Sequence, residues 1–260
     1  MVSSVVQFIR SLERDLKLWP ENCRPWFRGE SGKVEPLTPK VADIQPNEEM
    51  FLLQSFRRKA GGLFLNTPQR ENETDLWLFL AQHYGVKTRL LDWTEGALIA
   101  LFFAVNRGNS NPRVYMLNPH RLNNLASEKL KTKIDYPNFP LSWGNRDGGN
   151  IWLAWALKED RDKHPDIGLD LPIAIPATYR DHRMIAQRSC FTIHGKSLRG
   201  LDVLLSDAIP NISEYLITYK INSKASSKIT KQLFYLGISA ATIFPDLDNL
   251  SRDLNYEVSS

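Results

Sequence analysis

The sequence has few cysteines: its 260 residues include only Cys23 and Cys190. Two cysteines so far apart give neither a disulfide framework nor a metal-binding spacing, so reduced thiols in the cytoplasm are the simpler interpretation. Sequence motifs of the HExxH, CxxC, Gly-x-Ser-x-Gly and P-loop types are also missing. We therefore expect no metal site.

A long apolar run is absent as well. The first 19 residues mix charged with apolar side chains, which argues against a secretory signal or a membrane span there. Ser3 and Ser4 are alternative caps for an amphipathic helix. Its apolar residues recur at helical spacing: Val5, Phe8, Ile9, Leu12 and Leu16. We expect no association with a membrane.

The excess of positive charge is small, with 33 Lys and Arg against 29 Asp and Glu, giving a net charge of +4. This excess does not require nucleic acid, but it is compatible with an anionic ligand. Hydrophobic residues make up 42% of the chain and no repeat or linker divides it. We therefore expect one folded domain over residues 1–260.

Helical and strand patterns alternate along the chain, which predicts an α+β fold in a single domain. The central sheet is expected to be mixed, mainly antiparallel and flanked by helices. Strands are predicted at 25–30, 88–93, 113–117, 171–179, 190–194 and 214–221. Helices are predicted near the N-terminus and at 47–56, 73–84, 95–105, 231–237 and, after a Gly-rich loop, within 141–160.

The stretch RPWFRGE, residues 24–30, places an arginine inside a strand pattern. Arg28 follows Trp26 and Phe27, and an arginine on the inner face of a strand needs an anionic partner. Gly29 would let a backbone or a ligand approach closely. We therefore interpret Arg28 as a residue of a site rather than as a surface charge.

A second polar group follows the helix that is predicted to end at Gly85. Polar residues between two apolar helices are costly to bury unless they are paired. Two interpretations stand: a structural network in which Arg89 and Asp92 satisfy one another, and a functional site. The residues concerned are Gln82, His83, Tyr84, Thr88, Arg89, Asp92 and Thr94.

Several blocks of the sequence resemble the FRG domain family, which is named for the run found here at Phe27, Arg28 and Gly29. The blocks fall within residues 24–250, so the resemblance implies one FRG-type domain over nearly the whole chain. They are WFRGE at 26–30, AQHYGVKTRLLDWT at 81–94 with its following helix, RMIAQRSCFTIHG at 183–195, and LGISAATIFPDLDNL at 236–250.

The order of these blocks is also similar to ADP-ribosyltransferases of the arginine–serine–glutamate type. Asp92, Trp93 and Thr94 stand at the Ser-Thr-Ser place, and Ala100 and Phe103 lie in the following helix. The resemblance implies NAD as substrate, a split sheet, and transfer of ADP-ribose to a nucleic acid or protein, or hydrolysis of NAD. It also points to a toxin or antiphage effector with a regulatory or antitoxin partner.

By this resemblance Arg28 would hold the pyrophosphate, because a guanidinium pairs bidentately with phosphate oxygens. Thr94 would orient the ribose, and Gln187 stands where a catalytic Glu is expected. Gln187 cannot carry the charge that stabilises a cation, so the acid would come from elsewhere. The implied site residues are catalytic Arg28, Thr94, Gln187 and Asp92, and NAD-binding Arg28, Gly29, His83, Tyr84, Arg89 and Thr94; Glu30 and Asp246 are further candidates for the acid.

Two other functions remain open from the sequence. A module that binds a nucleotide or nucleic acid without chemistry would use the basic runs at 57–59 and 220–231. A nuclease would need Mg²⁺ held by carboxylates, for which Asp92, Asp246 and Asp248 are the suppliers. Asp246 has a structural alternative, because it follows Pro245 at a position typical of a helix N-cap.

Overall fold

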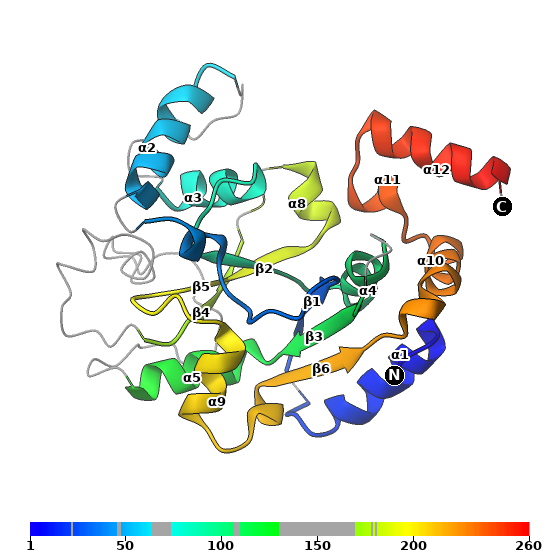
Figure 1. Ribbon diagram of the computed structural model, residues 1–260, viewed down its shortest axis with the longest axis horizontal. Helices are drawn as coiled ribbons and strands as arrows, with labels where there is room; N and C mark the ends of the chain where they lie inside the picture. The colour runs from blue at the N-terminus through cyan, green and yellow to red at the C-terminus, as the bar shows by residue number, and fades with distance from the viewer. Residues whose placement is uncertain are drawn as a thin grey trace.

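The computed structural model describes residues 1–21, 23–45, 48–63, 74–106, 110–129, 170–177, 179 and 181–259. These residues form an α+β fold around one six-stranded sheet of order β4-β5-β2-β1-β3-β6, in which every paired neighbour is antiparallel (Figure 1). The predicted fold class is confirmed. The strands are β1 (Trp26–Glu30), β2 (Leu90–Thr94), β3 (Arg113–Leu117), β4 (Ile173–Pro176), β5 (Ser189–Ile193) and β6 (Leu216–Lys220).

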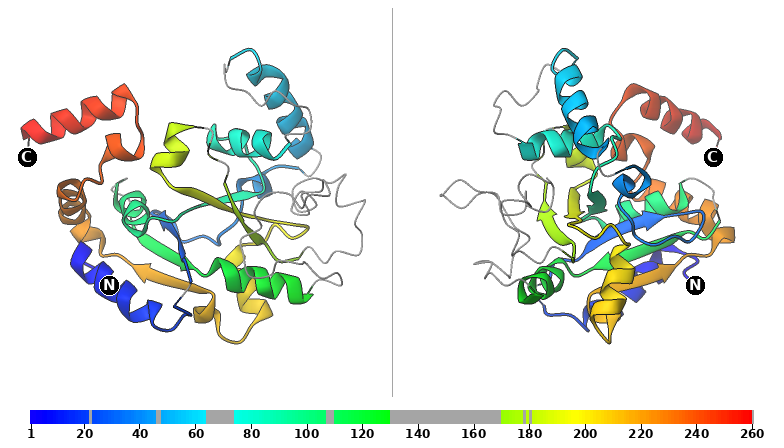
Figure 2. Two further views of the ribbon diagram at one scale, coloured as in Figure 1. Left: turned by 180° about the vertical axis from the view of Figure 1, so that it is seen from behind. Right: turned by 60° about the vertical axis from the view of Figure 1, so that its left-hand side comes forward.

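Helices surround this sheet (Figure 2). The α-helices are α1 (Val5–Leu16), α2 (Glu48–Ala60), α3 (Thr74–His83), α4 (Ala97–Val105), α5 (Pro119–Lys129), α8 (His182–Ala186), α9 (Leu201–Ala208), α10 (Ser226–Tyr235), α11 (Ala240–Ile243) and α12 (Leu247–Ser259). The short 3₁₀ helices are η1 (Lys40–Asp43), η2 (Ile212–Glu214) and η3 (Ser223–Ala225). Within the described residues no helix has both the length and the apolar character needed to cross a membrane.

Most predicted elements are present, with shifted boundaries. The Ser4 side chain caps α1 as expected, and Gly85 follows α3 with a φ of 82°. The helix predicted from residue 231 begins earlier, at Ser226, inside the lysine- and serine-rich stretch. Helices α5, α8, α9 and α11 were not predicted. The loop and helix expected at 141–160 lie outside the described residues.

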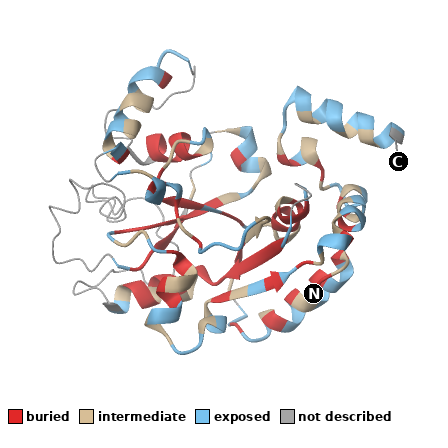
Figure 3. Cartoon of the chain, viewed as in Figure 1, coloured by how far each residue is buried: buried red, intermediate tan, exposed pale blue. Residues whose placement is uncertain are grey.

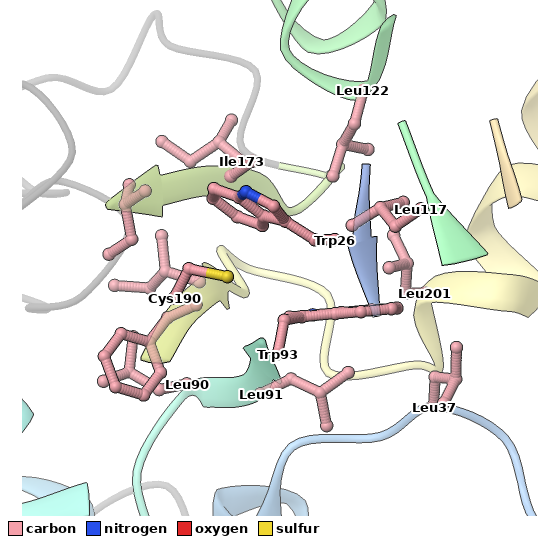
Figure 4. Packing of buried hydrophobic residues seen from close by; sticks show 14 of the residues in the cluster. Trp26, Leu37, Leu90, Leu91, Trp93, Leu117, Leu122, Ile173, Cys190 and Leu201 are labelled. Carbon is pink, nitrogen blue, oxygen red and sulfur yellow. The ribbon is translucent and has the colours of Figure 1, made fainter. Parts of the chain in front are cut away.

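Two apolar cores pack on the sheet, and the alternation of β1 separates them. Trp26 belongs to a core with β2, β4, β5 and α9, where Trp93 and Cys190 are also buried (Figure 4). Phe27 belongs to a second core formed with α1, α4 and α10. Buried residues accordingly follow the strands and the inward faces of these helices (Figure 3).

Gly29 allows α4 to lie directly on β1. A Cβ atom at this position would overlap the carbonyl oxygen of Ala100 and come 2.8 Å from the backbone nitrogen of Ala104. The close approach foreseen at this glycine is therefore made by the backbone of a helix. Because α4 occupies this side of Gly29, the residue contributes to packing rather than offering space to a ligand.

The sheet is weakly joined between β1 and β2. Their pairing is confined to Phe27 and Thr94, whereas every other neighbouring pair of strands is matched over four or five residues. The sheet therefore consists of two halves, β4-β5-β2 and β1-β3-β6, that separate beyond this one pair. This separation, called the split below, has Arg28 on one side and Asp92 on the other.

Candidate functional site

The Arg28 side chain bridges the split. Its Nη1 donates a hydrogen bond to the main-chain carbonyl of Asp92 at 2.7 Å and lies 4.0 Å from the Asp92 carboxylate. Its Nε donates to Oε1 of Glu30, also at 2.7 Å. The anionic partners that the sequence required for this arginine are thus Glu30 on its own strand and Asp92 across the split.

Three N–H groups of Arg28 remain for a ligand. A guanidinium carries five N–H donors, and the bonds to Glu30 and Asp92 use two of them. The Arg28 side chain is 22% exposed, so solvent reaches it, and no described residue accepts a bond from the remaining donors. This geometry suits a phosphate, whose oxygens pair with two parallel N–H groups.

Glu30 is held between two arginines. Its Oε2 accepts a hydrogen bond from Nη2 of Arg113 at 3.0 Å, while Oε1 accepts from Arg28. Arg113 is opposite Glu30 in the register of β1 and β3, and its Nε donates to the Tyr115 hydroxyl. With both carboxylate oxygens engaged, Glu30 positions Arg28 and is poorly placed to act on a substrate.

Asp92 is the exposed carboxylate of this group, with a side chain 55% accessible. Both of its carboxylate oxygens accept from Nε2 of Gln82 at 2.9 Å. The Gln82 amide is itself fixed, because its oxygen accepts from the Thr88 hydroxyl at 2.5 Å. Gln82 and Thr88 therefore orient Asp92 beside Arg28 without removing it from solvent.

The end of α3 brings His83 and Tyr84 toward the same region. His83 Nε2 lies 3.3 Å from the Asp181 carboxylate. The rings of His83 and Tyr84 meet edge to face, with their centroids 5.0 Å apart. Burial lowers the pKa of His83, and the charges of Asp181 and Asp92 oppose that effect. His83 is therefore largely neutral at pH 7 and close enough to Asp92 to sense its charge.

Thr94 and Gln187 are joined to one another, and the side chain of each makes hydrogen bonds to the main chain. The Thr94 hydroxyl donates to the main-chain carbonyl of Gln187 at 2.7 Å and accepts from the Gly96 N–H. The Gln187 amide nitrogen donates to the Ile243 carbonyl at 3.3 Å. In this state the Thr94 side chain supports the turn between α8 and β5, and the Gln187 side chain ties that turn to α11.

Arg89 is separate from the group at the split. It is buried, and its Nε forms an ion pair with Glu49 at 2.8 Å, while Nη1 donates to the Gly195 carbonyl. The network in which Arg89 and Asp92 would satisfy one another is therefore wrong, because each has its own partners. A buried arginine that is paired with a buried carboxylate in this way is architectural.

Asp246 caps a helix, as one of its two interpretations foresaw. Its Oδ1 accepts from the Asn249 backbone N–H at 2.8 Å, and this bond and the Asn249 side chain lower the pKa of Asp246. Within the described residues no group of three or more His, Cys, Asp or Glu side chains could hold a metal. Asp92, Asp246 and Asp248 thus do not form the cluster that a nuclease would need.

The two basic runs lie apart in the fold. Residues 57–59 end α2, whereas the lysines of 220–231 lie on β6, η3 and α10, at the other side of the molecule (Figures 1 and 2). They do not form one continuous face.

The Cys190 thiol is an inert core residue, because burial raises its pKa well above the usual range.

Some of these residues were not singled out from the sequence. Arg113, Tyr115 and Asp181 complete the polar group, and only the pairing of β1 with β3 and the position of α8 reveal them. A cross-strand partner for Glu30 was the available signal, because opposite charges often face one another on adjacent strands.

One family model matches part of the chain. Residues 24–113 match the family model of the FRG domain. The matched range includes the WFRGE block and the block from 81 to 94, and it contains Arg28, Glu30, Gln82 and Asp92. No curated protein and no solved structure matches the chain.

Proposed function

We propose that the protein binds NAD at the split and transfers its ADP-ribose to a macromolecular acceptor. The observation that carries this proposal is the juxtaposition of Arg28 with Asp92 where β1 and β2 separate. The three segments that resemble ADP-ribosyltransferases lie on β1, β2 and β5, which are consecutive in the sheet. One ligand at the split can therefore reach all three.

Arg28 is the group that would hold the pyrophosphate. Its three remaining N–H donors suit phosphate oxygens, and its bond to Glu30 fixes the plane of the guanidinium. Fixing the plane in advance reduces the conformational entropy that is lost when the ligand binds. Exposed Tyr84 at the end of α3 offers an aromatic surface for a base or for the nicotinamide ring.

Asp92 is the group that would act on the reacting bond. When the bond between nicotinamide and ribose breaks, its electron pair leaves with neutral nicotinamide, and positive charge develops on the ribose. A carboxylate stabilises that charge until the acceptor adds to the anomeric carbon and loses its proton. Asp92 is exposed and oriented by Gln82, so it supplies the charge that Gln187 lacks.

Thr94 and Gln187 would take part only after giving up their present bonds. The Thr94 hydroxyl can turn from the Gln187 carbonyl toward a ribose hydroxyl, because each is a single hydrogen bond. The free thiols of Cys23 and Cys190 agree with action in a reducing cytoplasm. Since loss of NAD harms a cell, such an activity suits a toxin or antiphage effector under the control of a partner.

The test measures, by chromatography, the release of nicotinamide from NAD by the purified protein. Calorimetry measures the affinity for NAD. We expect saturable binding and release, both weakened in Arg28→Ala. Arg24→Ala is the matched control, because Arg24 is exposed and lies four residues away. A folded protein that neither binds NAD nor releases nicotinamide contradicts the proposal; binding without release supports a nucleotide-binding module instead.

A further inference from the structure

Helix α12 presents an uncovered apolar stripe to solvent. Its large apolar residues follow one another at spacings of three, four and four residues, which places them on one face of the helix. Their exposed fractions range from 45% to 91%, so within the described residues neither the sheet nor another helix buries them. The residues of this stripe are Leu247, Leu250, Leu254 and Val258.

The opposite face of α12 anchors the helix. The Tyr256 ring packs on Phe234 of α10 with centroids 5.0 Å apart, and the Asp253 carboxylate accepts from the Ala241 N–H of α11 at 2.9 Å. Asp246 caps the first turn. These contacts fix the rotation of α12, so the stripe points outward from a helix that projects beyond the rest of the fold (Figure 2).

The surroundings of the stripe are acidic. Residues 246–259 contain the acids Asp246, Asp248, Asp253 and Glu257 and one base, Arg252, so four negative charges and one positive charge leave a net charge of −3. The whole chain carries +4, and the remainder therefore carries +7. An acidic helix on a basic protein selects a partner by charge as well as by apolar contact.

The negative charge around the stripe decides which kind of molecule can cover it. Two α12 helices from two copies of the chain would bring acids against acids. An anionic membrane surface would repel the same acids.

We propose that the stripe of α12 binds an amphipathic helix of another protein, one with an apolar face bordered by lysines or arginines. The apolar face would pack on the four stripe residues, and its basic border would meet exposed Asp248 and Glu257. This surface lies on α12 and is independent of the NAD site proposed at the split.

The probe is a synthetic amphipathic peptide of leucine and lysine, labelled for fluorescence anisotropy, with a leucine–glutamate peptide of the same pattern beside it. We expect the lysine peptide to bind saturably and the glutamate peptide not to bind. The Leu250→Asn, Leu254→Asn double variant should lose about tenfold or more in affinity, because truncating buried contacts has effects of that size. Salt should weaken the binding.

The matched control changes Leu18 and Leu63 to Asn, since both leucines are exposed and lie outside α12. The proposal is overturned if the lysine peptide does not bind, or if both double variants lose affinity equally. It is also overturned if the glutamate peptide binds as tightly as the lysine peptide. Self-association in the ultracentrifuge, or vesicle binding, that disappears in the α12 variant would assign the stripe to a second copy or to lipid instead.

Discussion

The guanidinium of Arg28 donates a hydrogen bond to the main-chain carbonyl of Asp92, 2.7 Å away, where the ladder between β1 and β2 has ended. A side chain thus provides the bond that a backbone N–H would make in a continuous sheet. Arg28 therefore joins the two halves of the sheet and, with its remaining donors, faces solvent between them. Substitutions of Arg28 need to separate these two roles.

Arg28→Lys keeps the positive charge but not the planar set of donors. One ammonium group cannot bond Glu30, the Asp92 carbonyl and a phosphate with the same geometry, so we expect NAD affinity to fall by about tenfold or more. Loss of the bridge should lower the free energy of unfolding by about 1 kcal/mol. Calorimetry and urea titration measure the two effects, with Arg24→Lys as control. Unchanged affinity would remove Arg28 from the NAD site.

Asp92→Asn tests the charge with little change in shape. The main-chain carbonyl that receives the Arg28 bond is retained, so NAD binding should change by less than about threefold. Release of nicotinamide should fall by about 10²-fold to 10³-fold, the usual cost of losing one electrostatic stabiliser. Asp246→Asn is the control, because that carboxylate caps a helix. Equal rates in wild type and Asp92→Asn would mean that another group supplies the charge.

The sequence was informative where local patterns decide the structure. Helix α4 is almost entirely apolar, and the alternation around Trp26 and Phe27 fits a strand with a core on each face. These features follow from residues within one turn or one strand of each other. Five-residue α8 is too short for a periodic signal, and α10 begins in a polar stretch whose buried residues, Ile229 and Leu233, are few.

Partners distant in the chain were beyond the reach of the sequence. The pattern indicated that Arg89 needs an anion, but it did not select Glu49, which is 40 residues away on α2, over nearby Asp92. The split was implied only by a resemblance, because register is a property of two paired strands. The sequence predicted which residue types belong to the site at the split. It did not predict their hydrogen-bond partners, because these depend on how β1, β2 and β3 meet.

Gly29→Ala should destabilise the fold. The added methyl group would overlap the Ala100 carbonyl, and backbone atoms of a buried helix cannot move away as a flexible side chain can. We expect a loss of about 3 kcal/mol or more, at the upper end of overpacking effects. Gly62→Ala, where nothing lies within 4 Å of the added carbon, should be nearly neutral. Urea unfolding compares the two, and equal stability would contradict the close packing of α4 on β1.

Glu49→Gln should be costly because it leaves the charge of Arg89 buried without a counter-charge. Breaking such a pair typically costs about 3–5 kcal/mol, whereas replacing both partners by apolar residues costs much less. The double variant Glu49→Leu, Arg89→Met should therefore be more stable than Glu49→Gln. Asp207→Asn is the control, because it breaks the exposed pair with Arg199 and should cost less than about 1 kcal/mol. If the double variant were less stable than Glu49→Gln, the pairing of Arg89 with Glu49 would not explain why an arginine stands at this position.

His194 should make stability depend on pH. It is fully buried, and its pKa is lowered to about 3. Burial is the larger cause, and the positive charge of Arg89 adds to it. The unfolded chain binds a proton near the ordinary histidine pKa of about 6.5, so acid favours unfolding. The contribution of His194 is complete above about pH 6.5 and is lost progressively as the pH falls toward about 3.

Between pH 7 and pH 5 the loss from this one residue should be about 2 kcal/mol. His194→Gln cannot gain the proton, so its unfolding free energy should fall less over that interval than that of the wild type. Exposed His182, changed to Gln, is the control and should follow the wild type. If the His194 variant fails to fold, wild type and His182→Gln still report the loss. A wild type whose stability is flat between pH 7 and pH 5 would show that His194 accepts a proton without unfolding.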